Sequence, residues 1–258
     1  MVAIMNPSNR SILITGGSSG IGEALARRYA AAGTRLALTG RDAERLAAVA
    51  DACRARGSTV EGAVLDVTDR AAMRAWIEHQ DDAHPFDLVI ANAGISSGMG
   101  RNEDETAARR VLAINLDGVV NTVYPLLPRL KARGAGQIAL ISSIAAFRGL
   151  PTAPAYCASK AAVKALGEAW RILLAPGGIR VSVVCPGYVT TRLTAKNRFT
   201  MPLIMSQERA AAIIAEGLAR NRGRIAFPWP TFFASWLMAA TPWRLSDALV
   251  RRIDAGRG

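Results

Sequence analysis

The 258-residue sequence predicts an α/β fold, a doubly wound parallel sheet of about seven strands with helices on both faces. Short apolar segments alternate with longer segments rich in alanine and leucine, as strands and helices do in parallel sheets. A glycine-rich turn follows the first apolar segment at once, as in a strand-turn-helix unit. No linker, low-complexity stretch or internal repeat divides the sequence, so residues 1–258 are expected to form one domain.

Each element is placed by its pattern and by the residues that end it. The predicted strands are 11–15, 35–39, 59–65, 86–90, 136–141, 179–184 and 224–227. The predicted helices are 23–32, 42–56, one from Thr68 or Asp69 to about Gln80, 103–133, 154–174 and one capped by Ser206. We expect a kink or break in 103–133, because Pro125 and Pro128 lie inside it. Ligands of such sheets bind beyond the carboxyl ends of the strands, so residues there are site candidates.

The turn after the first strand comprises Thr15, Gly16, Gly17, Ser18, Ser19, Gly20, Ile21 and Gly22. Glycines let the backbone approach a pyrophosphate, and the N-terminus of the following helix stabilises the negative charge. The spacing G-x-x-x-G-x-G departs from the G-x-G-x-x-G fingerprint. An ordinary Gly/Ser turn is the alternative, but the strand-turn-helix context favours a dinucleotide-binding site.

The end of the second strand indicates which dinucleotide binds. Gly40 stands near the position where NAD-selective units carry an acidic residue for the ribose 2′-hydroxyl, and Arg41 offers a guanidinium suited to a 2′-phosphate. The sequence therefore predicts NADP(H) in preference to NAD(H). The alternative is that Arg41 is a solvated loop cation and that Asp42 only caps the next helix.

Tyr156 and Lys160 lie four residues apart in the predicted helix 154–174, so they share one face. A nearby ammonium favours the phenolate, and we therefore expect Lys160 to lower the pKa of Tyr156. A tyrosine tuned in this way can act as a general acid near neutral pH. The pair alone is weak evidence, because both residue types are common on helix surfaces.

The composition narrows the classes of ligand, metal site and cellular location that the chain could have. The net charge of +12 favours phosphates, acidic ligands or anionic lipid surfaces, but the arginines are scattered and no nucleic-acid-binding motif is present. The three cysteines have no metal-like spacing and fit a reducing compartment, so no metal site is expected. His79 and His84 are interpreted as solvated loop residues. The first eleven residues lack a secretory pattern, and no run of about 18–20 apolar residues is found, which favours a cytoplasmic location.

These motifs, in their order and spacing, resemble the short-chain dehydrogenase/reductase family, in its short oxidoreductase branch with a Rossmann-type sheet. The resemblance spans about residues 10–191. It is carried by Thr15, Gly16, Gly20, Gly22, Asp66, Val67, Asn92, Ala93, Gly94, Asn115, Ser143, Tyr156, Lys160, Pro186, Gly187 and Thr191. One departure is Ala91, where the family often has a second asparagine.

The resemblance implies an oxidoreductase that transfers hydride between a nicotinamide and a carbonyl or secondary alcohol. Tyr156 would be the general acid or base, Lys160 would lower its pKa and hold the nicotinamide ribose, and Asn115 would hold a water in a proton relay. Ser143 lies thirteen residues before Tyr156, the family's usual spacing, and is chosen over Ser142 to bind the substrate oxygen. The implied cofactor contacts are Gly16, Ser18, Ser19, Gly20, Ile21, Gly22, Arg41, Asp66, Val67, Asn92, Ala93, Gly94, Tyr156, Lys160, Pro186, Gly187, Val189 and Thr191.

Beyond Thr191, the resemblance implies a substrate lid and helix over 192–222, followed by an aromatic C-terminal extension over 223–258. The lid segment 193–205 contains Phe199. The apolar stretch 228–238 has three interpretations: packing on its own core or a partner subunit, interfacial contact with the inner face of a membrane, or a wall for a hydrophobic substrate. Its prolines argue against a transmembrane helix.

The expected partner is a small carbonyl or alcohol substrate, and the expected assembly is a homodimer or homotetramer. Two other functions stay open at this point. One is a catalytically silent nucleotide-binding scaffold or regulatory protein, against which the intact Tyr156 and Lys160 argue. The other is a peripheral membrane reductase of lipid-like substrates, which the C-terminal stretch would permit.

Overall fold

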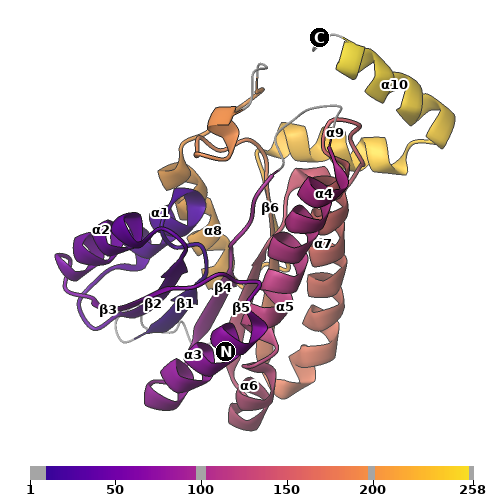
Figure 1. Ribbon diagram of the computed structural model, residues 1–258. Coiled ribbons are helices and arrows are strands. Elements are labelled where there is room, and N and C mark those ends of the chain that lie inside the picture. Colours follow the sequence, from indigo (N-terminus) through magenta and orange to yellow (C-terminus); the bar gives the residue numbers. More distant parts are fainter. Residues whose placement is uncertain (1–9, 97–102, 197–200, 256–258) are drawn as a thin grey trace.

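The computed structural model describes residues 10–96, 103–196 and 201–255. One sheet has the strand order β3-β2-β1-β4-β5-β6-β7, and all neighbouring strands are parallel (Figure 1). The strands are β1 (Ser11–Ile14), β2 (Arg35–Gly40), β3 (Thr59–Val64), β4 (Leu88–Ala91), β5 (Gly136–Ile141), β6 (Ile179–Pro186) and β7 (Arg224–Phe227). The predicted doubly wound sheet is confirmed, and β5 and β7 have the predicted bounds.

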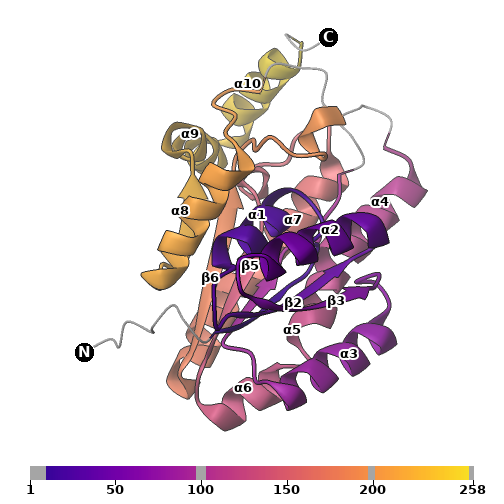
Figure 2. The ribbon, with the colours of Figure 1, turned by 90° about the vertical axis from the view of Figure 1, so that its left-hand side faces the viewer.

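Helices cover both faces of the sheet (Figures 1 and 2). They are α1 (Gly20–Tyr29), α2 (Ala43–Arg54), α3 (Arg70–Ala83), α4 (Glu105–Leu112), α5 (Gly118–Val123), α6 (Leu127–Arg133), α7 (Pro154–Leu174), α8 (Gln207–Ala219), α9 (Trp229–Ala240) and α10 (Trp243–Ala255). Side chains alternate along β1, so Ile12 and Ile14 pack with α1, α2 and α8. Leu13 packs with α3, α5 and α7 on the other face.

The helix starts follow the capping residues in the sequence. Asp42, Asp69 and Ser206 each accept a hydrogen bond from the backbone N–H three residues later, at 2.9–3.2 Å. Asp69, rather than Thr68, therefore caps α3. Helix α1 begins earlier than predicted, at Gly20, because its first turn is part of the glycine-rich loop.

The predicted helix 103–133 is divided into several pieces. A break separates α5 from α6 at residues 124–126, as the prolines predict, but a π-helical turn, Ala113–Asp117, also separates α4 from α5. Among the described residues, the stretch Glu105–Arg133 has the length and apolarity of a membrane span, contrary to the expectation that the chain contains no such run. Half of its apolar window is buried inside the protein, and a core helix of a soluble protein meets the same criterion.

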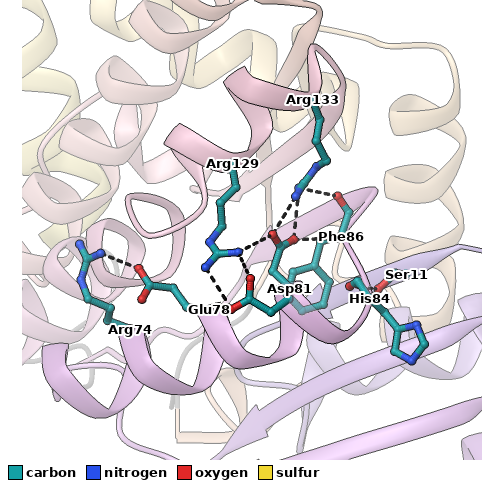
Figure 3. A network of polar contacts seen from close by, with 9 residues as sticks. Ser11, Arg74, Glu78, Asp81, His84, Phe86, Arg129 and Arg133 are labelled. Atoms are coloured by element: carbon teal, nitrogen blue, oxygen red, sulfur yellow. Dashed lines mark hydrogen bonds and ion pairs between the residues drawn. The ribbon is translucent and has the colours of Figure 1, made fainter.

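Helix α3 continues to Ala83, beyond the predicted end near Gln80, so His79 lies in the helix and not in a loop. Asp81 on α3 is buried and accepts a hydrogen bond from the backbone N–H of Phe86 at 2.8 Å (Figure 3). Both terminal nitrogens of Arg133, on α6, donate to the Asp81 carboxylate at 2.7 and 3.1 Å. Arg129 pairs with Asp82 and lies 3.6 Å from Asp81. This network ties α3 to α6 away from the carboxyl ends of the strands.

Replacing Asp81 with alanine is expected to lower the free energy of unfolding by about 2–3 kcal/mol, because it leaves the N–H of Phe86 and the head of Arg133 without their acceptor. Chemical denaturation with urea measures the change. Asp82→Ala removes the neighbouring, exposed carboxylate and should cost much less. Equal losses in the two variants would mean that burial of Asp81 contributes nothing.

Candidate active site

The carboxyl ends of β1, β2, β4, β5 and β6 border a cavity of about 540 Å³. Most of the predicted site residues line it, although they come from segments far apart in the sequence. They are Gly16, Ser18, Ser19, Gly20, Ile21, Arg41, Asp66, Val67, Asn92, Ala93, Gly94, Ser143, Tyr156, Lys160, Pro186, Gly187, Val189 and Thr191. Of the predicted set, Gly22 and Asn115 do not line the cavity.

The glycine-rich turn has the backbone that its sequence requires. Gly16 and Gly20 have φ angles of 66° and 60°, a left-handed conformation that other residues rarely adopt. Gly22 serves packing, since a Cβ there would lie 2.3 Å from the carbonyl oxygen of Gly16. The Ser19 side chain makes no capping hydrogen bond, so the first N–H groups of α1 are not occupied by it. Such a helix N-terminus suits a phosphate.

The end of β2 gathers charge. Arg41 lies 3.7 Å from the Asp66 carboxylate, and Arg45 pairs with Asp42 at 2.8 Å. Arg110 also lines this part of the cavity. Burial acts to raise the pKa of Asp66, but hydrogen bonds from Thr68 and the charges of Arg41 and Arg110 outweigh it and lower that pKa. Asp42 caps α2, as the alternative interpretation expected, and Arg41 lines the cavity.

Position 40 has no room for a side chain. A Cβ on Gly40 would lie 2.7 Å from the Ser18 hydroxyl oxygen, within the phosphate-suited turn. An acidic residue at this point could not fit without displacing Ser18. The absence of a carboxylate at the end of β2 is therefore built into the packing of the turn.

Tyr156 and Lys160 lie on α7 at the floor of the cavity, and the Lys160 Nζ is 5.8 Å from the centre of the Tyr156 ring. The buried ammonium of Lys160 donates a hydrogen bond to the carbonyl of Ile141 at 2.9 Å. Ser143 caps the short turn Ile144–Ala146, and its hydroxyl accepts from the N–H of Ala145 at 3.1 Å. Three groups able to move or stabilise a proton thus meet beside the end of β5.

The ionisation of these groups differs from the sequence-based expectation. Burial raises the pKa of Tyr156 to about 12, although hydrogen bonding to Ser143 acts in the opposite direction. Burial lowers the pKa of Lys160 to about 8. The expected lowering of the tyrosine pKa by Lys160 is therefore wrong for the protein alone, because desolvation of the phenolate dominates. At pH 7 the phenol and the ammonium both carry their protons.

Asn115 lies in the π-helical turn Ala113–Asp117 and does not line the cavity itself. Its side chain is buried in the π-helical turn, and its oxygen accepts from the N–H of Ile95 at 2.8 Å. Its amide nitrogen donates to the carbonyl of Ile95 at 2.9 Å and to the Ser159 hydroxyl at 3.0 Å. Asn115 therefore holds the segment that follows β4 and borders the cavity. A Cβ on Gly94 would lie 3.2 Å from the Asn115 side-chain oxygen and 3.3 Å from Lys160 Nζ, so the backbone passes close to both groups here.

The structure separates the two serine candidates. The Ser142 hydroxyl donates to the carbonyl of Lys160 at 2.7 Å and is committed to holding β5 against α7. The Ser143 hydroxyl lies beside Tyr156 and is 3.5 Å from the carbonyl oxygen of Pro186. Sequence reasoning missed Arg45 and Arg110 as cavity residues. Only the folded topology brings Arg110 close to Asp66. Among the described residues, no cluster of His, Cys, Asp and Glu could hold a metal ion, and the three cysteines are free and buried.

An all-parallel doubly wound sheet, with a phosphate-suited turn at its carboxyl edge, defines a dinucleotide-binding α/β protein. A family model described as short chain dehydrogenase matches residues 10–201. An uncharacterized oxidoreductase of Myxococcus xanthus is 37% identical over 250 residues, which cover 95% of this chain and 98% of that protein.

Solved structures agree with the sequence comparison. A short-chain dehydrogenase from Sphingobium yanoikuyae in complex with NADPH has a TM-score of 0.79 at 29% identity, covering 85% of this chain and 88% of that one. A short-chain dehydrogenase from Mycobacterium paratuberculosis bound to NAD has a TM-score of 0.76 at 25% identity, covering 87% and 98%. The chain belongs to the short-chain dehydrogenase family, and it is an NAD(P)-dependent dehydrogenase or reductase.

Proposed function

We propose that the protein is an NADP(H)-dependent oxidoreductase that interconverts a carbonyl compound and a secondary alcohol, with Tyr156 as general acid or base. The observation that carries this proposal is the meeting of Tyr156, Lys160 and Ser143 at the floor of the dinucleotide-suited cavity. The bound nicotinamide supplies or accepts the hydride. The protein contributes proton transfer, orientation and electrostatic stabilisation.

The cavity residues fit a dinucleotide at both ends. The turn from Gly16 to Ile21 and the N-terminus of α1 would hold the pyrophosphate, and Asp66 and Val67 would border the adenine. Asn92, Ala93 and Gly94 would lie against the ribose, while Pro186, Gly187, Val189 and Thr191 would border the nicotinamide. Gly20 supports this arrangement, because a Cβ there would approach the Thr191 side chain to 3.2 Å.

Each group of the catalytic centre has a distinct task in carbonyl reduction. The Tyr156 phenol, held protonated by burial, donates its proton to the substrate oxygen. The Lys160 ammonium stabilises the phenolate that this transfer leaves behind. The Ser143 hydroxyl donates a hydrogen bond to the oxygen on which negative charge develops. Asn115 acts as a positioning residue through its clamp on Ile95.

Two observations support a preference for NADP(H). Gly40 excludes the acidic side chain that would select a free ribose 2′-hydroxyl. Arg41, Arg45 and Arg110 line the same end of the cavity and offer guanidinium groups suited to a 2′-phosphate. The two carboxylates nearby, Asp66 and Asp42, each pair with an arginine, at 3.7 and 2.8 Å, so their negative charges are offset.

The segment after β6 suits a substrate lid. Arg192, Leu193 and Thr194 line the cavity, and the far end of the segment is anchored where the N–H of Thr190 donates to the carbonyl of Met205 at 2.8 Å. Residues 197–200, including Phe199, lie outside the described residues. We propose that the described parts of the lid segment 193–205 border the substrate and that specificity for the carbonyl compound resides there.

The direct test is oxidation of NADPH and NADH by the purified protein with a panel of aldehydes, ketones, quinones and acyl-derived ketones. We expect turnover with at least one carbonyl class and faster turnover with NADPH. Nucleotide binding without turnover across the panel would instead favour a silent nucleotide-binding scaffold.

With a responsive substrate, the rate of carbonyl reduction is expected to be flat below about pH 7, to be halved near the Lys160 pKa of about 8 and to fall above it. The reaction uses protonated Tyr156, whose pKa is about 12, and protonated Lys160, whose pKa is about 8. A pH profile of kcat at saturating NADPH measures this decline. Because one proton is lost, kcat should fall by about tenfold per pH unit well above the pKa. A profile that stays flat to about pH 10 would contradict the role of the Lys160 charge.

Loss of stability caused by titration of Lys160 does not explain such a fall in rate. Its pKa is lower in the folded protein than the ordinary value of 10.5, so the unfolded chain binds more protons between about pH 8 and 10.5. Stability from this residue therefore rises with pH over that interval. Circular dichroism across the same interval checks that the fold persists.

A further inference from the structure

Helix α9 carries an apolar face that no other part of the described chain covers. The helix contains no charged residue. Its large apolar side chains Trp229, Phe233, Trp236 and Leu237 are 42–68% exposed and recur at helical spacing, so they share one face. Trp229 stacks on Phe233 with ring centres 5.3 Å apart, and Phe233 lies 5.9 Å from Trp236. The aromatic side chains thus form one continuous surface.

The opposite side of α9 is fixed to the body of the protein. Phe232 packs edge-on against Phe147, with ring centres 5.4 Å apart. The start of the helix lies against Gly187, where a Cβ would meet Pro228 at 2.9 Å and Thr231 at 3.4 Å. Because these contacts set the rotation of the helix, the aromatic face cannot turn inwards without breaking them.

Helix α10 adds both apolar and cationic groups. Trp243, Leu245 and Leu249 are 49–75% exposed. Arg244, Arg251 and Arg252 are exposed as well. The one aspartate of this helix whose side chain is described, Asp247, pairs with Arg148. Arg148 in turn lies 4.9 Å from the centre of the Trp243 ring and holds the start of α10 on the body.

We propose that α9 and α10 dock on the surface of a bilayer that contains anionic lipids. Exposed tryptophans beside arginines suit the headgroup level, and the positive net charge of +12 complements an anionic surface. Helix α9 has 12 residues, about 18 Å, which is too short to cross a hydrocarbon core but suits a helix lying in the interface. A non-obligate protein partner is less well matched, because such interfaces contain about one hydrogen bond per 100–200 Å² and the α9 face is almost entirely apolar. A second copy of the chain is separated from a bilayer by the experiments below.

The docking surface lies next to the candidate active site. Figures 1 and 2 place α9 and α10 at the end of the molecule that carries the segment Thr194–Lys196. Gly187, against which α9 begins, also lines the cavity. A bilayer held by these helices would therefore border the entrance for substrate. If the proposed function is correct, the carbonyl substrate is an amphiphile supplied from the bilayer. The docking itself does not rest on the proposed function.

Co-sedimentation of the full chain with vesicles tests the docking without any turnover. Vesicles of phosphatidylcholine are compared with vesicles that contain roughly 30% phosphatidylglycerol. We expect binding to the anionic vesicles that is at least about tenfold tighter than binding to the neutral ones. In Trp236→Ser/Leu237→Ser, binding should weaken by about tenfold or more. Arg251→Gln/Arg252→Gln should weaken binding only to the anionic vesicles.

Matched variants elsewhere on the surface distinguish docking through α9 and α10 from nonspecific hydrophobic binding and from an effect of the overall charge. Ile172 and Leu173 are exposed apolar neighbours on α7, and Ile172→Ser/Leu173→Ser should bind vesicles as the natural chain does. Arg70→Gln/Arg74→Gln removes two charges from α3 and should likewise leave binding unchanged. Thermal unfolding of each variant confirms that the fold is retained.

Three results would overturn the proposal. One is an absence of binding to both kinds of vesicle. Another is equal weakening in the α7 and α9 variants. The third is an oligomer in lipid-free solution that Trp236→Ser/Leu237→Ser dissociates while no vesicle is bound, which would assign the face to a second copy of the chain. Light scattering after size-exclusion chromatography measures that mass. None of these readouts depends on turnover, so failure of the docking and failure of the proposed function are distinguishable.

Discussion

The Tyr156→Phe variant is expected to lose at least about 100-fold in kcat for carbonyl reduction, because it removes only the hydroxyl that donates the proton. NADPH affinity should change little, since the ring and its contacts with α7 remain. Steady-state kinetics gives the loss in kcat, and titration of NADPH fluorescence gives the affinity. A variant that keeps most of its turnover would show that Tyr156 is not the proton donor.

Tyr29 provides a matched control for this experiment. Burial raises its pKa to about 12 as well, and its buried hydroxyl has no hydrogen-bond partner among the described residues. It lies at the end of α1 and does not line the cavity. Tyr29→Phe should therefore leave kcat unchanged. Similar losses in the two variants would trace the effect to packing, whereas a loss confined to Tyr156 would trace it to proton transfer.

The comparison of Tyr29 with Tyr156 shows that a shifted pKa alone does not identify a catalytic residue. Both shifts arise from desolvation, but only Tyr156 lies beside a buried ammonium and a serine hydroxyl in a cavity. The sequence identified Tyr156 through its spacing to Lys160 and through motifs at other strand ends. It predicted the direction of the shift wrongly, because the cost of burying a phenolate depends on side chains from distant segments.

Local patterns predicted the frame of the molecule well. The bounds of β5, α7 and β7 agree with the structure, since each is set by a short apolar run or by a proline or glycine at its end. The π-helical turn at Asn115 was not predicted. It depends on hydrogen bonds from Asn115 to Ile95 and Ser159, which lie 20 and 44 residues away.

Burial of charge was the harder feature to predict. Asp81 lies in a polar stretch of sequence that resembles a loop, yet Arg129 and Arg133 reach it from helix α6, which lies far along the chain. Arg110 reaches the Asp66 end of the cavity in the same way. The apolar stretch after β7 could be assigned to a core, a partner or a membrane from sequence alone. The contact of Phe232 with Phe147 and the packing of the helix start on Gly187 determine which of its faces is exposed.

The Arg41→Ala variant is expected to weaken NADPH binding by about 10- to 100-fold while NADH binding changes much less, as removal of one charge-assisted contact to a phosphate predicts. Arg41 is half exposed, so salt screens the interaction, and the selectivity should shrink as ionic strength rises. Binding of both nucleotides is measured by fluorescence titration at low and high salt. Arg110→Ala should act in the same direction, since its guanidinium lines the same end of the cavity. Arg74→Ala, on exposed α3, should affect neither nucleotide. Equal losses of NADPH and NADH affinity in the Arg41 variant would refute the preference for NADP(H) and leave Arg41 as a partner of Asp66 alone.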